Sequence, residues 1–191
     1  MSLMEKQFWQ DYKSSFFTVP VVVVSVDGKT RPNLITLGWT GIVNSDPLMV
    51  GISVRPSRYS RDLLHEHKVF GLNIPNKALA AGTDYCGIKS GRDVDKVSEL
   101  GWHVFRGRSL GVPLVEEFPV NAECQITQII PLGSHELFLA EVKGVYIAKE
   151  YLKGNRVDWT TAEGLVYGSQ TYYVVKEGVF GQGDSYRELK K

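Results

Sequence analysis

Hydrophobic and polar residues alternate along several short stretches of the chain, which is the pattern of half-buried β-strands. Residues 47–55 show it best: four large apolar side chains point one way, and Met49, Gly51, Ser53 and Arg55 point the other. Alternation and β-branched composition predict strands over 19–26, 33–40, 47–55, 68–74, 119–130, 137–148 and 171–175. Asp27-Gly28 predicts a tight turn after the first strand.

Helical segments are few and short. The pattern predicts helices over 58–66, with Ser57 as N-cap, over 76–86, and over 94–100, capped by Asp93. Residues 5–17 are interpreted as a short helix or a docking arm, and residues 101–116 as irregular. Because the strands follow one another without a βαβ rhythm, we predict a mainly β fold. An antiparallel Greek-key barrel fits best, and a β-sandwich is the alternative.

Composition narrows the function classes. The 191 residues, 43% of them hydrophobic, are enough for one domain with a buried core, which we place at 4–191 with residues 1–3 taken as an addition ahead of Met4. The formal net charge of +1 favours neither a nucleic-acid nor a membrane partner. The two cysteines have no zinc-site spacing, and no signal peptide or membrane-spanning run is seen, so we expect a cytoplasmic protein.

The segment 55–61 holds the strongest local signal. It contains three arginines and two serines where a strand gives way to a helix, and no acid occurs between Asp46 and Asp62. Free N–H groups at a helix N-terminus together with arginine side chains bind phosphate readily. The alternative is that Ser57 only caps the helix and the arginines are solvated.

Two further features suggest what the phosphate belongs to. Small residues on two strand faces (Thr36, Gly38 and Thr40 on one, Gly51 and Ser53 on the other) would let a flat heterocycle approach the backbone. The loop 88–93 offers Lys89, Ser90 and Arg92 as donors around Gly91. Together they predict a flat ligand with a phosphate tail. No Walker or Rossmann glycine pattern occurs, which disfavours a doubly wound dinucleotide domain.

The histidines and cysteines form no catalytic pattern. His65 and His67 are two residues apart near a helix end and are interpreted as surface residues rather than metal ligands. His135 lies in a turn between two long strands, where it is either solvated or directed into a cleft. Cys124 alternates with apolar neighbours, so we expect it in the core.

In this order, the motifs resemble those of the flavin reductase-like, FMN-binding split-barrel proteins, and most closely the flavoredoxin branch. The resemblance covers residues 18–175 and is carried by Pro20-Val-Val-Val-Val-Ser, Asn33-Leu-Ile-Thr-Leu-Gly-Trp39, the strand 47–55 with Arg58-Tyr-Ser60, Phe70-Gly-Leu-Asn-Ile74, Ser90-Gly-Arg-Asp-Val-Asp-Lys96 and Ser134-His135-Glu136-Leu-Phe-Leu-Ala-Glu-Val142.

The resemblance implies a six-stranded Greek-key split barrel, a homodimer and one FMN per subunit. The strand with Asn33, Thr36, Leu37, Gly38, Trp39 and Thr40 would meet the ring and ribityl chain, and Ser53, Arg55, Arg58, Tyr59 and Ser60 would hold the phosphate end. Ser90, Gly91 and Arg92 would close over the cofactor, and His135 would lie beside the flavin and the nicotinamide of NADH or NADPH. Ser134 and Ala140 depart from the family pattern in a way that suits the flavoredoxin branch.

The resemblance therefore predicts an FMN-dependent oxidoreductase that takes hydride from NADH or NADPH. Its acceptor would be a redox partner protein or a small molecule. Two alternatives stay open: an electron carrier with tightly bound FMN and no nicotinamide turnover, and a non-catalytic module that binds flavin or haem.

Overall fold

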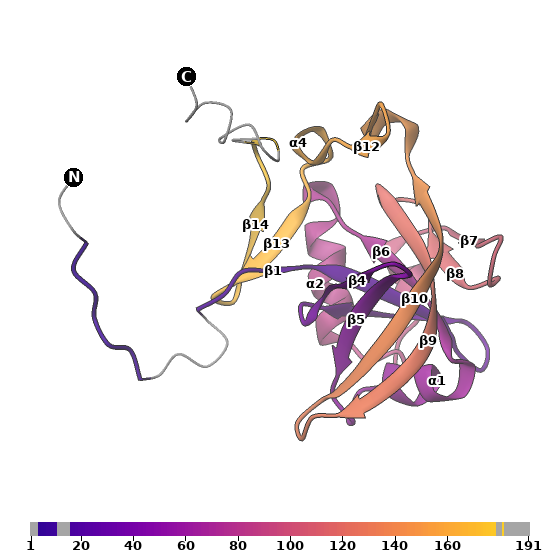
Figure 1. The fold of residues 1–191 in the computed structure, drawn as a ribbon. Helices are drawn as coiled ribbons and strands as arrows, with labels where there is room; N and C mark the ends of the chain where they lie inside the picture. Colours follow the sequence, from indigo (N-terminus) through magenta and orange to yellow (C-terminus); the bar gives the residue numbers. More distant parts are fainter. Residues whose placement is uncertain (1–3, 11–15, 179–180, 182–191) are drawn as a thin grey trace.

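The structure of the chain is a computed structural model that describes residues 4–10, 16–178 and 181. Strands dominate it (Figure 1). In chain order the strands are β1 (Val19–Pro20), β2 (Val22–Asp27), β3 (Pro32–Leu37), β4 (Thr40–Ser45), β5 (Leu48–Val54), β6 (Val69–Ile74), β7 (Val104–Arg106), β8 (Pro113–Val115), β9 (Val120–Pro131), β10 (Glu136–Ile147), β11 (Leu152–Lys153), β12 (Arg156–Val157), β13 (Leu165–Gly168) and β14 (Thr171–Val174). The helices are α1 (Tyr59–His67), α2 (Ala80–Ile88), α3 (Lys96–Leu100) and α4 (Trp159–Ala162), with short 3-10 turns η1 (Lys77–Leu79) and η2 (Lys149–Tyr151).

The main sheet is a split barrel. Its seven strands are antiparallel and run in the order β3-β2-β6-β9-β10-β5-β4. The two outermost strands, β3 and β4, are halves of one strand bent at Gly38-Trp39, so the sheet closes on itself as a six-stranded barrel. A hydrogen bond from the Ser53 N–H to the Trp39 carbonyl, 2.8 Å long, links β5 to the bend. The Greek-key barrel prediction is confirmed, and the sandwich alternative is wrong.

Two apolar cores hold the barrel and its helices together. The barrel interior contains Phe70, Phe138 and Ile52, all fully buried, and Leu63 and Leu64 of α1 extend this core. A second core includes Val23 and Leu34 of the barrel with Cys86 of α2 and Phe118, and side chains of α3 pack against it. Helices α2 and α3 therefore cover the outer side of β2 and β3, while α1 packs into the barrel core.

Several sequence-based boundaries need correction. The predicted strand 33–40 ends at Leu37, because the chain bends at Gly38-Trp39 and then continues as β4. The segment 101–116 is not wholly irregular: β7 and β8 pair within it. Residues 165–168 form β13, which also has no predicted counterpart. Residues 4–10 and 16–18 have no helix, and residues 4–10 lie apart from the barrel (Figure 1), while 11–15 fall outside the described residues.

Two predicted helix caps are wrong. The N-cap position of α1 is Arg58, one residue after Ser57, and no side chain caps this helix. Helix α3 begins at Lys96, and Asp95 rather than Asp93 accepts a hydrogen bond from the Ser98 N–H at 3.2 Å. In the described part of the chain, no helix is long and apolar enough to span a membrane.

Glu123 of β9 is a fully buried carboxylate that organises the loop 107–112. It accepts hydrogen bonds from the N–H groups of Ser109 (2.9 Å) and Leu110 (2.6 Å) and from the Tyr146 hydroxyl (2.7 Å). Burial raises the pKa of Glu123, but these donors outweigh burial, and its net pKa is lowered. Gly107 is required here because a side-chain carbon at this position would overlap the Glu123 carboxylate.

We expect Glu123→Gln to lower the free energy of unfolding at neutral pH by about 1–3 kcal/mol, because a buried amide cannot accept all three hydrogen bonds. Because the folded-state pKa is lowered, the carboxylate's contribution is present above its ordinary pKa of 4.5 and is lost as the pH falls through the folded-state pKa. Urea titrations at several pH values will measure this contribution, with exposed Glu116→Gln as the control. Equal stability of Glu123→Gln and wild type at neutral pH would contradict it.

Candidate functional site

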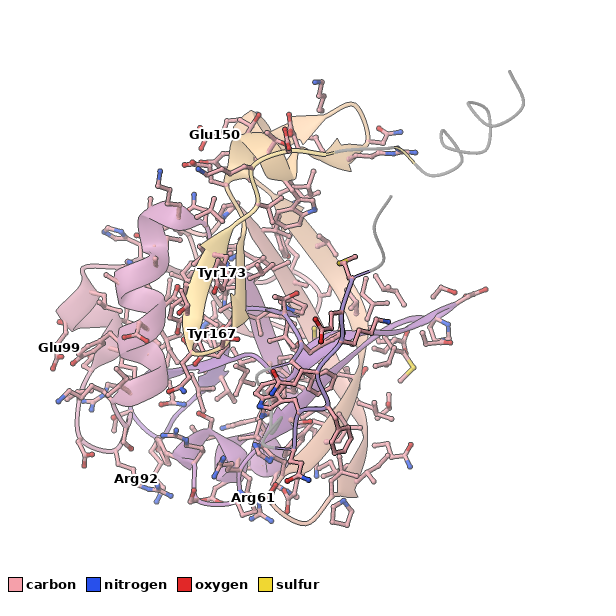
Figure 2. All side chains as sticks on the ribbon, turned by 90° about the vertical axis from the view of Figure 1, so that its left-hand side faces the viewer. Arg61, Arg92, Glu99, Glu150, Tyr167 and Tyr173 are labelled. Carbon is pink, nitrogen blue, oxygen red and sulfur yellow. The ribbon has the colours of Figure 1, made fainter. Side chains whose placement is uncertain are left out.

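A groove runs along β3, where the barrel is split. β3 is an edge strand that pairs only with β2, so the other edge of Asn33–Leu37 has no strand partner. Three cavities adjoin it and share lining residues with one another. Figure 2 views this side of the molecule, with Arg92 toward one end and Tyr167 of β13 farther along. A strand edge of this kind offers free peptide groups to a ligand.

The first cavity, here the Arg58 cavity, encloses about 180 Å³ between β3, the start of α1 and the loop after α2. Its lining includes Arg58, Lys89 and Arg92 but no acidic residue. Because no side chain caps α1, the N–H groups of its first turn have no side-chain acceptor. An anion bound here would meet these N–H groups and the guanidinium of Arg58 together.

Asn33, next to Gly91, leaves one buried hydrogen-bond acceptor at this cavity without a donor. The Asn33 side-chain amide donates to the hydroxyl of buried Ser60 at 2.7 Å. Its carboxamide oxygen is shielded from solvent and has no hydrogen-bond partner. A buried acceptor without a donor costs about 1–3 kcal/mol, which a ligand hydroxyl would offset. Gly91 is needed beside it, because a side-chain carbon there would overlap the Asn33 oxygen.

Lys96 is a buried lysine that lines the Arg58 cavity. Its side chain is 4% exposed, and its ammonium group donates to the carbonyl oxygens of Leu34 (2.6 Å) and Cys86 (2.9 Å). Burial lowers the pKa of Lys96. The lysine therefore joins β3 to the C-terminal end of α2 beneath the anion site.

The second cavity, here the His135 cavity, lies where β3 bends toward β4. It is lined by residues of the bend with Ser53, Arg55, Arg58 and His135, and Arg58 thus belongs to both cavities. Burial, followed by the nearby charge of Arg55, lowers the pKa of His135. The imidazole is therefore neutral at pH 7 and its Nδ1 lies 2.9 Å from the Ser134 hydroxyl.

The third cavity, here the tyrosine cavity, continues from the bend toward α2 and the small sheet β1-β13-β14. Trp39, Ile88, Tyr167 and Tyr172 line it, and the Tyr172 hydroxyl donates to Asp84 at 3.2 Å. Its walls are mostly aromatic and apolar. The groove as a whole thus has a cationic end at Arg58, a polar middle at His135 and an aromatic end at Tyr167.

Comparisons with known proteins agree with this geometry. A family model described as "Flavin reductase like domain" matches residues 14–176. The chain belongs to the flavin reductase-like family.

Solved structures place this flavin reductase-like chain with the flavoredoxins. Flavoredoxin from Methanosarcina acetivorans superposes with a TM-score of 0.88 at 26% identity, over 97% of this chain and 100% of that one. Flavoredoxin of Desulfovibrio vulgaris (Miyazaki F) gives 0.88 at 27% identity, over 96% and 100%. An FMN-binding protein from Thermus thermophilus, solved with bound 1-cyclohex-2-enone, gives 0.79 at 25% identity, over 95% and 99%.

The matches to curated sequence relatives cover only part of each relative's length. An uncharacterized protein of Aeropyrum pernix is 28% identical over 156 residues, which cover 81% of this chain and 59% of that protein. An NADPH-flavin oxidoreductase of Streptomyces viridifaciens is 28% identical over 128 residues, or 63% of this chain and 62% of that protein. The chain therefore spans less than two thirds of the length of both relatives.

A flavin fits the groove of this flavin reductase-like chain. The Arg58 cavity offers cations and N–H donors to a terminal phosphate, and the unpartnered Asn33 oxygen offers an acceptor to a ribityl hydroxyl. The His135 and tyrosine cavities offer the free edge of β3 and apolar walls to a flat ring.

The structure brings nearly all of the predicted site residues together. Asn33, Tyr59, Ser60, Ser90, Gly91 and Arg92 line the Arg58 cavity, Thr36, Leu37, Gly38 and Trp39 line the His135 cavity, and Arg58 lines both. Ser53 and Arg55, assigned to the phosphate end from the resemblance, line the His135 cavity together with Arg58. Thr40 lines neither cavity and pairs with Ile52 in the β4–β5 ladder. Gly51 is covered by Val43 and Leu137, so it offers no surface to a ligand.

The sequence reasoning missed Lys96, which has no signal of burial in its local pattern. It also missed His65, whose Nε2 lies 2.7 Å from a Glu136 oxygen. Both cysteines are free and fully buried, and burial raises the pKa of each thiol to about 12, so Cys124 is a core residue as predicted. Across the described residues, no group of three or more His, Cys, Asp or Glu side chains is arranged to hold a metal ion.

Glu136 anchors the turn that carries His135. Its carboxylate accepts two hydrogen bonds from the Arg61 guanidinium of α1, at 2.9 and 2.7 Å, and contacts His65. These partners lower the pKa of Glu136 to about 2. The turn itself is closed by a hydrogen bond from the Leu132 N–H to the His135 carbonyl at 2.8 Å. This clamp of Arg61 and His65 on Glu136 thus sets the position of the preceding residue, His135, in its cavity.

We expect Glu136→Gln to loosen this turn, because a neutral amide cannot accept the paired guanidinium hydrogen bonds and the contact with His65 together. Amide hydrogen–deuterium exchange in residues 132–136 should then rise several-fold at neutral pH. Glu66→Gln, at an exposed position of α1, is the control and should leave this exchange unchanged. Unchanged exchange in Glu136→Gln would show that the clamp does not hold the turn.

Proposed function

We propose that this chain is an FMN-dependent oxidoreductase of flavoredoxin type that takes hydride from NADPH or NADH. The single observation that carries the proposal is the convergence of Arg58, Ser60 and the turn 90–92 on one cavity at the uncapped start of α1. Arg58 also lines the His135 cavity, so a phosphate bound at Arg58 would direct the rest of the ligand toward His135. The names of the flavoredoxin and FMN-binding neighbours support FMN as the flavin.

The chain's own residues bind and orient in this proposal. When bound, the flavin supplies the redox chemistry, accepting hydride from a nicotinamide and passing electrons to a protein or small-molecule acceptor. Arg58 holds the phosphate by charge-assisted hydrogen bonds, and the free edge of β3 holds the ring through its peptide groups. Neutral His135 stands beside the ring without adding a positive charge, while Arg55 supplies one close by. NADPH as the donor is supported by the name of the Streptomyces viridifaciens relative.

We further propose a homodimer in the cytoplasm. β4 is an edge strand that follows directly on the Trp39 bend, and its Ile42 and Val43 side chains are 73% and 53% exposed. Exposed apolar residues on a strand edge favour contact with a second copy. A reducing compartment is supported by the two free, buried cysteines.

Arg58→Ala should weaken FMN binding about 10- to 100-fold, which corresponds to the loss of a hydrogen-bonded charge pair. Binding of riboflavin, which lacks the phosphate, should stay within about twofold of wild type, since only phosphate contacts are removed. Quenching of flavin fluorescence measures both affinities, and Arg156→Ala on β12 is an exposed control. Equal losses for FMN and riboflavin would refute the placement of the phosphate.

Ile42→Glu should convert the dimer to a monomer, because it puts a charge into the proposed contact. Sedimentation velocity across a range of protein concentrations measures the change. Leu152→Glu, at an apolar side chain of β11 that is 45% exposed, is the matched control and should leave the dimer intact. A wild-type chain that sediments as a monomer at every concentration would contradict the dimer.

A further inference from the structure

The N-terminal arm, here residues 4–10 with their root at 16–18, exposes aromatic side chains that take no part in the groove of their own chain. Phe8 is 86% exposed, Trp9 50% and Phe17 62%. Figure 1 shows residues 4–10 apart from the barrel. Large apolar side chains gathered on an exposed chain end are typical of a segment that packs against another surface. The single chain therefore leaves these aromatic side chains uncovered.

The root of the arm is fixed on the hairpin of β13 and β14. Val19 of β1 pairs with Tyr167 in an antiparallel register, which carries the residues before β1 past the end of β13. Thr18 lies against Gly168, where an added side-chain carbon would be 2.9 Å from the threonine methyl group. From the root, the arm leads outward from the barrel (Figure 1). The arm thus starts beside the tyrosine cavity, which Tyr167 lines, and points away from its own chain.

The tyrosine cavity and the edge strand β4 lie on the same side of the molecule as this root. Strand β1 pairs with β13 and also contacts β4. Trp39 and Ile88, which line the cavity, are 40% and 66% exposed, and the exposed Ile42 and Val43 belong to β4. The root of the arm therefore lies between the aromatic end of the groove and the apolar edge that we propose as the contact with a second copy.

Two-fold symmetry at this face would exchange the arms of two copies. In a symmetric dimer the same surface is used on both copies, so an arm that leaves one copy at the contact runs along the same face of the other. The nine residues from Trp9 to Phe17 span at most about 30 Å when extended, at about 3.3–3.6 Å per residue. This reach allows Phe8 and Trp9 to cross from their own root to the tyrosine cavity of the second copy.

We propose that Phe8 and Trp9 of one copy cover the tyrosine cavity of a second copy, so that each groove is completed by the arm of the other. Aromatic side chains seated in an apolar pocket are the usual anchors of a protein contact. The inference rests on the homodimer put forward under the proposed function. It adds two residues to the site, which close the aromatic end of the groove and exclude water from a ring bound there.

Photo-cross-linking between copies tests where the arm lies. Trp9 is replaced by p-benzoylphenylalanine, which reacts with neighbouring C–H bonds under ultraviolet light, and the variant is mixed with isotope-labelled wild type before irradiation. We expect residue 9 to cross-link to labelled peptides that contain residues 84–88 or 167–172. The same photoreactive residue in place of exposed Leu152 is the control and should not label these peptides. Cross-links from residue 9 that stay within one copy, or that miss the cavity, would overturn the inference.

A second measurement uses the strength of the dimer. Phe8→Ser/Trp9→Ser should raise the dissociation constant of the dimer about 10-fold or more, because two aromatic anchors are lost. Val145→Ser/Leu152→Ser, at two side chains that are 51% and 45% exposed, is the matched control and should leave it unchanged. Sedimentation velocity across a range of concentrations measures both constants.

The outcomes separate the arm from the other proposals. An unchanged dissociation constant in Phe8→Ser/Trp9→Ser would overturn the role of the arm and leave the homodimer standing. A wild-type chain that is monomeric at every concentration would overturn the homodimer and this inference together. Neither measurement needs bound flavin, so failure of the chain to bind FMN would overturn the proposed redox function without deciding where the arm lies.

Discussion

The barrel closes at one point and stays open beside it, and the groove depends on this arrangement. The bend at Gly38-Trp39 lets one strand pair with β2 along its first half and with β5 along its second. The hydrogen bond from Ser53 to the Trp39 carbonyl holds β5 against the bend. Before the bend, the free edge of β3 adjoins the Arg58 and His135 cavities. A barrel closed along the whole strand would leave no peptide edge for a ligand.

The distribution of charged side chains leaves the Arg58 cavity lined by cations and by no acidic residue. Several nearby acids have partners of their own: Glu136 binds Arg61 and His65, and Asp27 binds Arg106. Asp62 contacts Arg92 at the groove, and Asp84 accepts a hydrogen bond from Tyr172. Lys96 is the buried exception, since its charge is satisfied by two backbone carbonyls and not by a carboxylate. A chain with a net charge of only +1 thereby concentrates positive charge around one anion site. In the proposed function, this local arrangement, rather than the net charge, favours a phosphorylated ligand.

Local pattern was enough to predict most of the fold. Alternation in 48–54 correctly places Ile52 and Val54 in the core, and the Asp27-Gly28 turn and the long β9–β10 hairpin follow from strand and turn composition. The bend at Gly38-Trp39 was not predictable, because the apolar pattern continues through it. Its position depends on pairing with β5, which is a tertiary contact.

The site was predictable in its parts but not in its assembly. The basic segment 55–61 was the strongest local signal and the loop 88–93 was weak by itself, and the fold brings residues of both to one cavity. The roles of Lys96 and Glu136 depend on partners 62 and 75 residues away in sequence, Leu34 and Arg61. No local pattern carries that information. The family resemblance indicated that the ligand is a flavin, and the structure shows where the groove runs.

The absorption spectrum of the FMN-loaded protein shows directly whether the chain holds a flavin that a nicotinamide can reduce. The protein is incubated with FMN, freed of excess by gel filtration, and its visible spectrum is recorded before and after anaerobic addition of NADPH or NADH. We expect the flavin bands to elute with the protein and to bleach on addition of a reduced nicotinamide. Protein that elutes colourless after loading would contradict the flavin site, and retained FMN that neither nicotinamide bleaches would contradict hydride transfer from a nicotinamide.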